Sequence, residues 1–311
     1  MLIPYRSEAD PEVQGEGSID PLALLALADR LAEWILPGMT ARMWRPRFVT
    51  AIAVASIVVE PFEEVLAKDG ITPPWLIFEW YFVEPMTRLE ESNGGLRRIP
   101  GIDKARQAVA DKVPMNPDRY LKTPKVFGFH GVYKRLASHI GIVDSHLTLS
   151  EAGYRLVRIW EEEQGLTGFS DNTRSEGEGP KIRRTLRDAV QKSLETGQTE
   201  RHGAWLGASF LVDHLTPHRM GKREGRLLWD LLLDAQAEPR GEIFRSLRNS
   251  DLLRVFSENG SERVLIQGLR AGVSEKLRCR IEAIEAYEGF CRLLQEVLDR
   301  MRFLSTQRRP A

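Results

Sequence analysis

The feature that most constrains the fold is the apolar run Phe48–Val59, in which only Thr50 and Ser56 are polar. A helix that is apolar on every side has to be buried on every side. The run is too short to span a bilayer, which needs about 20 residues. It therefore predicts a central helix of a soluble protein, and a chain of 311 residues is long enough to surround it with other elements.

Helical patterns lie on both sides of this run. Asp20–Pro21 can begin a helix whose apolar residues recur at helical spacing from Leu24 to Ile35, and Pro37–Gly38 can end it. Residues 72–89, TPPWLIFEWYFVEPMTRL, predict a third helix rich in aromatic side chains. A helical core explains these aromatics best, and an aromatic ligand cage is the alternative.

Breaks in composition predict the domain organisation. Gly94–Gly95 ends one helical region, and the stretch GLTGFSDNTRSEGEGP is rich in glycine, serine and acid, as linkers are. The predicted fold class is mainly α with one short β-hairpin. We expect a mobile acidic arm over 1–20, an N-terminal helical domain over 21–95, a winged-helix-like domain over 96–165, a linker over 166–180 and a C-terminal helical domain over 181–311.

The central stretch predicts a helix, a hairpin and a second helix. The first helix should cover residues 129–140, followed by short strands at Ile142–Asp144 and Leu147–Leu149 with Ser145–His146 as the turn. Ser150 can cap the second helix. This order is that of the second half of a winged helix-turn-helix, and the run GIVDSHLTLSEAGYRLV resembles the wing and last helix of bacterial winged-helix proteins.

Positive charge is concentrated near this element although the net charge of the chain is zero. Residues 97–135 contain ten Lys or Arg and only three acids. A helix fits the major groove of DNA, and Lys and Arg neutralise phosphates. We therefore expect duplex DNA contacts from Lys122, Lys125, His130, Lys134, Arg135, Ser138, Arg155 and Arg158.

The C-terminal segment predicts one long helix. Its apolar residues alternate steps of three and four: Ile284, Tyr287, Cys291, Leu294, Leu298 and Met301. We expect a helix over 280–304 whose Ile284, Leu294 and Leu298 face is buried in its own bundle. A coiled-coil or partner-docking seam, which would support a homo-oligomer, is the alternative.

Catalytic patterns are weak. Metal-capable side chains gather at 200–224: Glu200, His202, Asp213, His214, His218 and Glu224. Pro217 makes a continuous helix through the two later histidines doubtful, and no HExxH completes a site. GKREG lacks the phosphate-loop pattern, and no GxSxG is present. We expect no enzyme activity, no cofactor and no metal, with a metal-dependent nuclease or hydrolase as the weaker alternative.

A more diffuse resemblance concerns the biological setting. The segments ILPGMTARMWRPRF and AYEGFCRLL, with the winged-helix-like centre between them, are similar to uncharacterised proteins of bacterial anti-phage defence islands. The resemblance implies a subunit that works beside larger ATPase or nuclease partners. Cys279 and Cys291 stand in no CxxC, which fits a reducing cytoplasm. We expect no membrane association, because the longest apolar run is too short to span a bilayer. The expected function is a non-catalytic DNA-binding or DNA-sensing subunit, and a protein-only helical adaptor or scaffold is the alternative.

Overall fold

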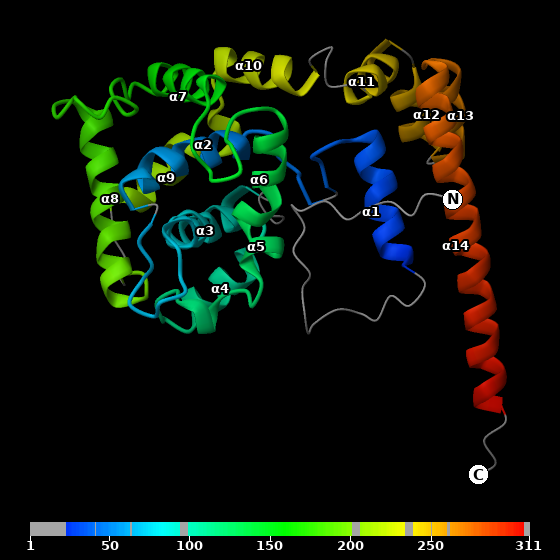
Figure 1. The fold of residues 1–311 in the computed structure, drawn as a ribbon, viewed down its shortest axis with the longest axis horizontal. Helices are drawn as coiled ribbons and strands as arrows, with labels where there is room; N and C mark the ends of the chain where they lie inside the picture. The colour runs from blue at the N-terminus through cyan, green and yellow to red at the C-terminus, as the bar shows by residue number, and fades with distance from the viewer. Residues whose placement is uncertain are drawn as a thin grey trace. The chain divides into compact units, whose positions relative to one another are not determined.

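The protein is mainly α-helical, as the sequence predicts. The computed structural model describes residues 23–40, 42–62, 64–93, 99–200, 206–233, 239–249, 251–259 and 262–307. These ranges contain fourteen α-helices and no strand (Figure 1). Within them, no helix combines the length and the apolar character needed to cross a membrane.

Two compact units make up the chain. The larger unit is Leu36–Gly241, and the smaller unit combines Met1–Ile35 with Glu242–Ala311. The helices of the larger unit are α2 (Phe48–Val59), α3 (Pro74–Asn93), α4 (Ile102–Ala110), α5 (Pro124–Phe127), α6 (Phe129–His139), α7 (Glu151–Glu163), α8 (Glu178–Thr196), α9 (Leu206–Leu215) and α10 (Lys222–Leu233).

Helix α2 is the centre of the larger unit. Every residue from Phe48 to Val59 is buried, and the helix contacts α3, α6, α7, α8 and α9 (Figure 1). This confirms the helix buried on all sides. The larger unit has one continuous hydrophobic core. This core contains residues before and after position 95, and before and after segment 166–180, where the sequence predicts breaks between domains.

The aromatic segment forms α3 and packs into the same core. Phe78, Tyr81 and Phe82 are buried, and the ring of Phe82 lies 4.4 Å from that of Phe129 between centroids. These aromatic side chains therefore pack in the core, which agrees with the helical core that the sequence favours over an aromatic ligand cage.

A buried carboxylate on α3 fixes where α6 begins. Glu79 accepts hydrogen bonds from the backbone N–H of Phe129 (2.9 Å) and His130 (2.8 Å) and from the Tyr120 hydroxyl (2.5 Å). Negative charge is stabilised at a helix N-terminus. Gly128 is required here, because a Cβ would lie 2.3 Å from the Glu79 Oε1 atom. Burial, reinforced by the Glu79 charge, raises the pKa of Tyr120 well above its ordinary value, so the hydroxyl remains a donor.

The predicted β-hairpin is not formed within the described residues. Val143 and Leu149 make a single isolated antiparallel bridge instead of two strands. Asp144 organises the loop between them, since its carboxylate accepts from the backbone N–H of His146 (2.8 Å) and Thr148 (2.9 Å). Leu147 has a positive φ of 70°, which interrupts the extended conformation that a second strand would need.

The segment 166–180, which its composition led us to interpret as a linker, packs against α7 and α8. Leu166 and Phe169 are buried in the core. Arg183 of α8 donates to the carbonyls of Gly168 (3.0 Å) and Phe169 (2.6 Å). Glu161 of α7 accepts from the N–H of Gly168 at 3.2 Å. Two buried charged side chains therefore satisfy the backbone of a loop that its composition predicts to be free.

The smaller unit has its own small core. Its helices are α1 (Leu24–Ile35), α12 (Leu252–Asn259), α13 (Glu262–Ala271), α14 (Glu275–Gln307) and most of α11 (Arg240–Asn249). The buried core residues are Ile243, Val273, Leu277 and Ile281. Helix α1 packs along α14, where the Tyr287 hydroxyl donates to the Leu24 carbonyl at 2.5 Å.

Helix α14 confirms the predicted long helix but not the predicted burial of its apolar face. Ile284 and Leu294 are only half-buried, and Leu298 is 42% exposed. The packed part of α14 is its first half, where Leu277 and Ile281 contribute to the core. The expected burial in a bundle is therefore wrong for the C-terminal half.

Candidate nucleic-acid interface

An open groove of about 1200 Å³ runs between α7 and α10 on the larger unit. It is lined by apolar side chains and by charged side chains, most of which are basic. The basic lining residues are Arg155, Arg158, Lys222, Arg223 and Arg226, and the acidic ones are Glu151 and Asp230. A chain without net charge thus places five cations and two carboxylates along one groove.

The start of α7 is fixed by two local contacts. The Ser150 hydroxyl oxygen accepts from the N–H of Gly153 at 3.1 Å, which confirms the predicted cap. Gly153 allows a close approach, because a Cβ there would lie 2.3 Å from the carbonyl oxygen of Ile142. This start sets the rotation of α7 about its axis. Arg155 and Arg158, three positions apart, consequently share its exposed face, as expected from the sequence.

Helix α7 also caps α10. The two Glu163 carboxylate oxygens accept from the N–H of Arg223 (2.8 Å) and of Glu224 (2.9 Å). Gly221 leaves room for this carboxylate, since a Cβ would lie 1.9 Å from the Glu163 Oε2 atom. An acid at the N-terminus of a helix satisfies otherwise unpaired amides. The first turn of α10 is therefore held beside the C-terminal end of α7.

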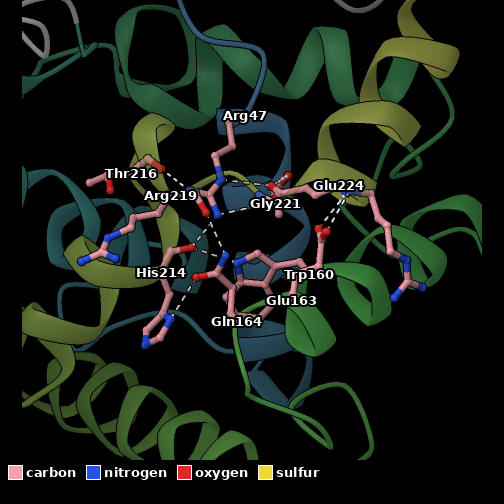
Figure 2. Close-up of polar contacts among 11 residues, drawn as sticks. Arg47, Trp160, Glu163, Gln164, His214, Thr216, Arg219, Gly221 and Glu224 are labelled. Atoms are coloured by element: carbon pink, nitrogen blue, oxygen red, sulfur yellow. Dashed lines mark hydrogen bonds and ion pairs between the residues drawn. The ribbon is translucent and has the colours of Figure 1, made fainter.

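A buried ion pair ties α10 to the central helix (Figure 2). Arg47, just before α2, donates from Nε to Glu224 Oε1 at 3.0 Å and from Nη2 to Oε2 at 3.1 Å. The Thr50 hydroxyl donates to the same carboxylate at 2.7 Å. The Arg47 and Glu224 side chains are 2% and 0% exposed. Burial lowers the pKa of Arg47, and the neighbouring Glu224 carboxylate opposes that shift.

The segment between α9 and α10 is held by the same arginine and by α7. Arg47 donates to the carbonyls of Thr216 and His214. The His214 carbonyl also accepts from Trp160 Nε1 at 2.9 Å. The Nδ1 atom of the His214 ring lies 3.2 Å from the Gln164 Oε1 atom (Figure 2). Burial lowers the pKa of the His214 imidazole. These contacts hold the segment before α10 against Arg47 and α7.

The basic side chains of the groove differ in whether they form ion pairs with acidic side chains. Arg223 pairs with Glu162 at 2.7 Å, and Arg226 pairs with Asp230 at 3.5 Å. Arg155, Arg158 and Lys222 are exposed, and none of them makes an ion pair or hydrogen bond within the part of the chain that the structure describes. These three side chains are available to an anionic ligand.

The residues predicted on α6 are placed less favourably. His130 is 3% exposed, and its Nδ1 atom lies 3.3 Å from Glu79 Oε2. It cannot reach a base edge, so its predicted DNA contact is wrong. Lys134 is half-buried and donates from Nζ to the Ser145 carbonyl at 2.8 Å. Burial lowers its pKa. Arg135 is half-buried as well.

The other predicted contacts lie at the surface. Lys122 and Lys125 are exposed before and within α5, and Ser138 is exposed near the end of α6. Only Arg155 and Arg158 of the predicted set line the groove. Lys222, Arg223 and Arg226 were missed, although the run KREGR carries the signal.

The metal-capable cluster at 200–224 is dispersed. Glu200 pairs with Lys192 at 3.5 Å, and Glu224 is committed to Arg47. Helix α9 ends at Leu215 before Pro217, as the proline predicts. His202 lies outside the described residues. In the described ranges no group of three or more His, Cys, Asp or Glu side chains could hold a metal ion.

Comparison of the chain with protein-family models, with curated proteins and with solved structures finds no match.

Proposed function

We propose that this protein is a non-catalytic component that binds duplex DNA, and that the groove between α7 and α10 receives the phosphate backbone. One observation carries the proposal. Arg155, Arg158 and Lys222 are exposed side by side without an acidic partner among the described residues. Uncompensated cations of this kind release counterions from DNA, which supplies sequence-independent affinity.

The dimensions of the groove support a polymer as the ligand. Its lining extends from Glu151 to Ile159 on α7 and from Lys222 to Leu231 on α10. These segments of nine and ten residues rise about 12–14 Å along their helices. Measured along the duplex axis at about 3.4 Å per nucleotide, this length spans about four nucleotides of one strand. Arginine forks donate two parallel hydrogen bonds to a phosphate, which suits the exposed Arg155 and Arg158.

The order of α6, the loop at 142–149 and α7 resembles the second half of a winged helix-turn-helix in which the hairpin is reduced to one bridge, and we propose α7 as the DNA-facing helix. Helix α6 contacts α2, α3 and α5 and buries Phe129, His130, Val132, Tyr133, Leu136 and Ala137. Gly131 faces α5 closely, since a Cβ there would lie 2.5 Å from the Lys125 carbonyl. A helix packed in this way offers little surface to a major groove.

Fluorescence anisotropy with a labelled duplex at several salt concentrations tests the proposal. The groove variant is Arg155→Glu with Arg158→Glu. The control is Lys181→Glu with Lys192→Glu, two exposed residues of α8 with the same change in charge. We expect the groove variant to bind about tenfold more weakly per lost contact, because a hydrogen bond to a charged group contributes about 1.5–3 kcal/mol. Its log–log salt slope should flatten by about 0.9 per phosphate contact.

A second pair of variants separates the groove from α6. Lys134→Glu with Arg135→Glu should lower affinity less than the groove variant does, because both side chains are half-buried. Equal affinities and equal salt slopes for wild type, groove variant and control would overturn the proposal. The protein-only adaptor would then be the leading function. Larger ATPase or nuclease partners, implied by the resemblance to defence proteins, remain a prediction that co-purification can test.

A further inference from the structure

The C-terminal half of α14 exposes a long apolar surface that the proposed DNA binding does not use. Seven large apolar side chains there are between 42% and 62% exposed: Phe290, Leu293, Val297, Leu298, Met301, Phe303 and Leu304. Phe290, Val297, Leu298, Met301 and Leu304 lie on one face of the helix, and soluble monomers seldom leave a large apolar face uncovered. By contrast, Leu277 and Ile281 in the first half of the helix are buried.

This surface follows a heptad pattern with two different flanks. The central seam consists of Ile284, Tyr287, Cys291, Leu294, Leu298 and Met301. On one side of the seam, residues seven apart are apolar: Phe290, Val297 and Leu304. On the other side, residues seven apart are polar: Glu288, Gln295 and Arg302. Leu293 and Phe303 lie outside both flanks.

We propose that this face binds the same face of a second copy of the chain, with the two α14 helices antiparallel. In an antiparallel pair each flank meets its own equivalent across a two-fold axis, as a self-complementary interface requires. With Gln295 on the axis, Glu288 of each copy faces Arg302 of the other. Residues 288–304 then pair over about 25 Å of helix.

The apolar flank is self-complementary in the same register. Val297 meets Val297 of the second copy, and Phe290 meets its Leu304. A parallel pair would instead place the polar flank of one helix against the apolar flank of the other, so that Arg302 would face Val297. The distribution of charge therefore favours the antiparallel pair.

Both charged residues have contacts within their own helix that must yield. Glu288 is ion-paired with Arg292, and Arg302 is ion-paired with Asp299 at 3.9 Å. Arg292, Asp299 and Arg302 are all exposed. Exposed pairs one helical turn apart contribute little to stability. The carboxylate can therefore turn to Arg302 of the second copy as the apolar seam closes.

The mass of the full chain in solution tests the association. Sedimentation equilibrium should give a concentration-dependent dimer of two 35.4-kDa chains. Leu298→Asp should give a monomer with unchanged circular dichroism, because Leu298 is already 42% exposed. Ile71→Asp, at a residue of the larger unit that is 72% exposed, should leave the dimer intact. A wild-type monomer at every concentration, or a dimer that survives Leu298→Asp, overturns the proposal.

Charge reversal and cross-linking test the orientation. Glu288→Arg or Arg302→Glu alone should raise the dissociation constant about tenfold, because both symmetry-related pairs become repulsive. The two changes together should restore it. In a chain with Cys279→Ser and Cys291→Ser, Gln295→Cys should form a disulfide with itself across the axis. No restoration, or no cross-link at residue 295 in a chain that still dimerises, overturns the antiparallel pair.

Discussion

Removing the Glu224 carboxylate should destabilise the larger unit more than removing an exposed acid. The side chain is completely buried, and it accepts from Arg47 twice and from Thr50 once. Glu224→Ala would leave a charged guanidinium in the core without its counterion. Truncating one partner of a buried ion pair costs about 3–5 kcal/mol. Loss of the acceptor for the Thr50 hydroxyl adds about 1 kcal/mol.

A double-mutant cycle isolates the pair itself. Arg47→Met should also cost about 3–5 kcal/mol, because it leaves the Glu224 carboxylate buried and the His214 and Thr216 carbonyls without this donor. Arg47→Met with Glu224→Ala should cost less than the two single changes together, by about 1–3 kcal/mol. The remaining cost should come from the two carbonyls and the Thr50 hydroxyl, which lose their partners.

Urea denaturation followed by tryptophan fluorescence measures these free energies. Trp80 and Trp160 are fully buried in the larger unit, so their emission reports its unfolding. Glu162→Ala is the matched control. Its partner Arg223 is exposed, and such a pair contributes at most about 1 kcal/mol. If Glu224→Ala lowered the unfolding free energy no more than Glu162→Ala does, or if the cycle were additive, the reasoning would be refuted.

Two further predictions concern the support of the groove. Gly153→Ala, which would normally favour a helix, should instead lower the unfolding free energy of the larger unit by about 1–3 kcal/mol, because its Cβ would meet the Ile142 carbonyl at 2.3 Å. A melting temperature equal to or above that of wild type would contradict this. Burial lowers the pKa of His214 in the folded chain, so protonation favours the unfolded chain, and wild type should lose stability as the pH falls below the ordinary histidine pKa of about 6.5. The His214→Gln variant should lose less unfolding free energy than wild type over the same pH range. Identical pH profiles of the two proteins would contradict this role of His214.

The sequence predicted helices well, because their signals are local. The apolar run at Phe48–Val59 could satisfy its surface only at the centre of a helical protein, and α2 lies there. Periodicity, however, shows which face of a helix is apolar and not whether another element covers it. Leu277 and Leu298 lie three heptads apart on α14, yet Leu277 is 1% exposed and Leu298 is 42% exposed. That difference depends on where α1 and α13 pack.

The candidate site was less predictable, because it depends on contacts far apart in the sequence. Arg155 and Arg158 could be identified from their position off the apolar face of α7. Lys222 gains its role only because Glu163 holds α10 beside α7. His130 shares a helical ridge with Lys134, but the buried Glu79 carboxylate lies against it. No pattern around residue 130 could indicate an acid on α3.

The charge presented by α10 shows how a neutral chain can offer a basic groove. Its first turns read KREGR, in which Glu224 would partly offset three cations if all four side chains faced solvent. In the fold Glu224 points inward and is neutralised by Arg47, which comes from 177 residues earlier in the chain. Glu163 of α7 is occupied by the amides of α10, and Glu162 pairs with Arg223. These acids are therefore committed to other partners, and Lys222 faces solvent in the same groove as Arg155 and Arg158 without an acidic partner among the described residues.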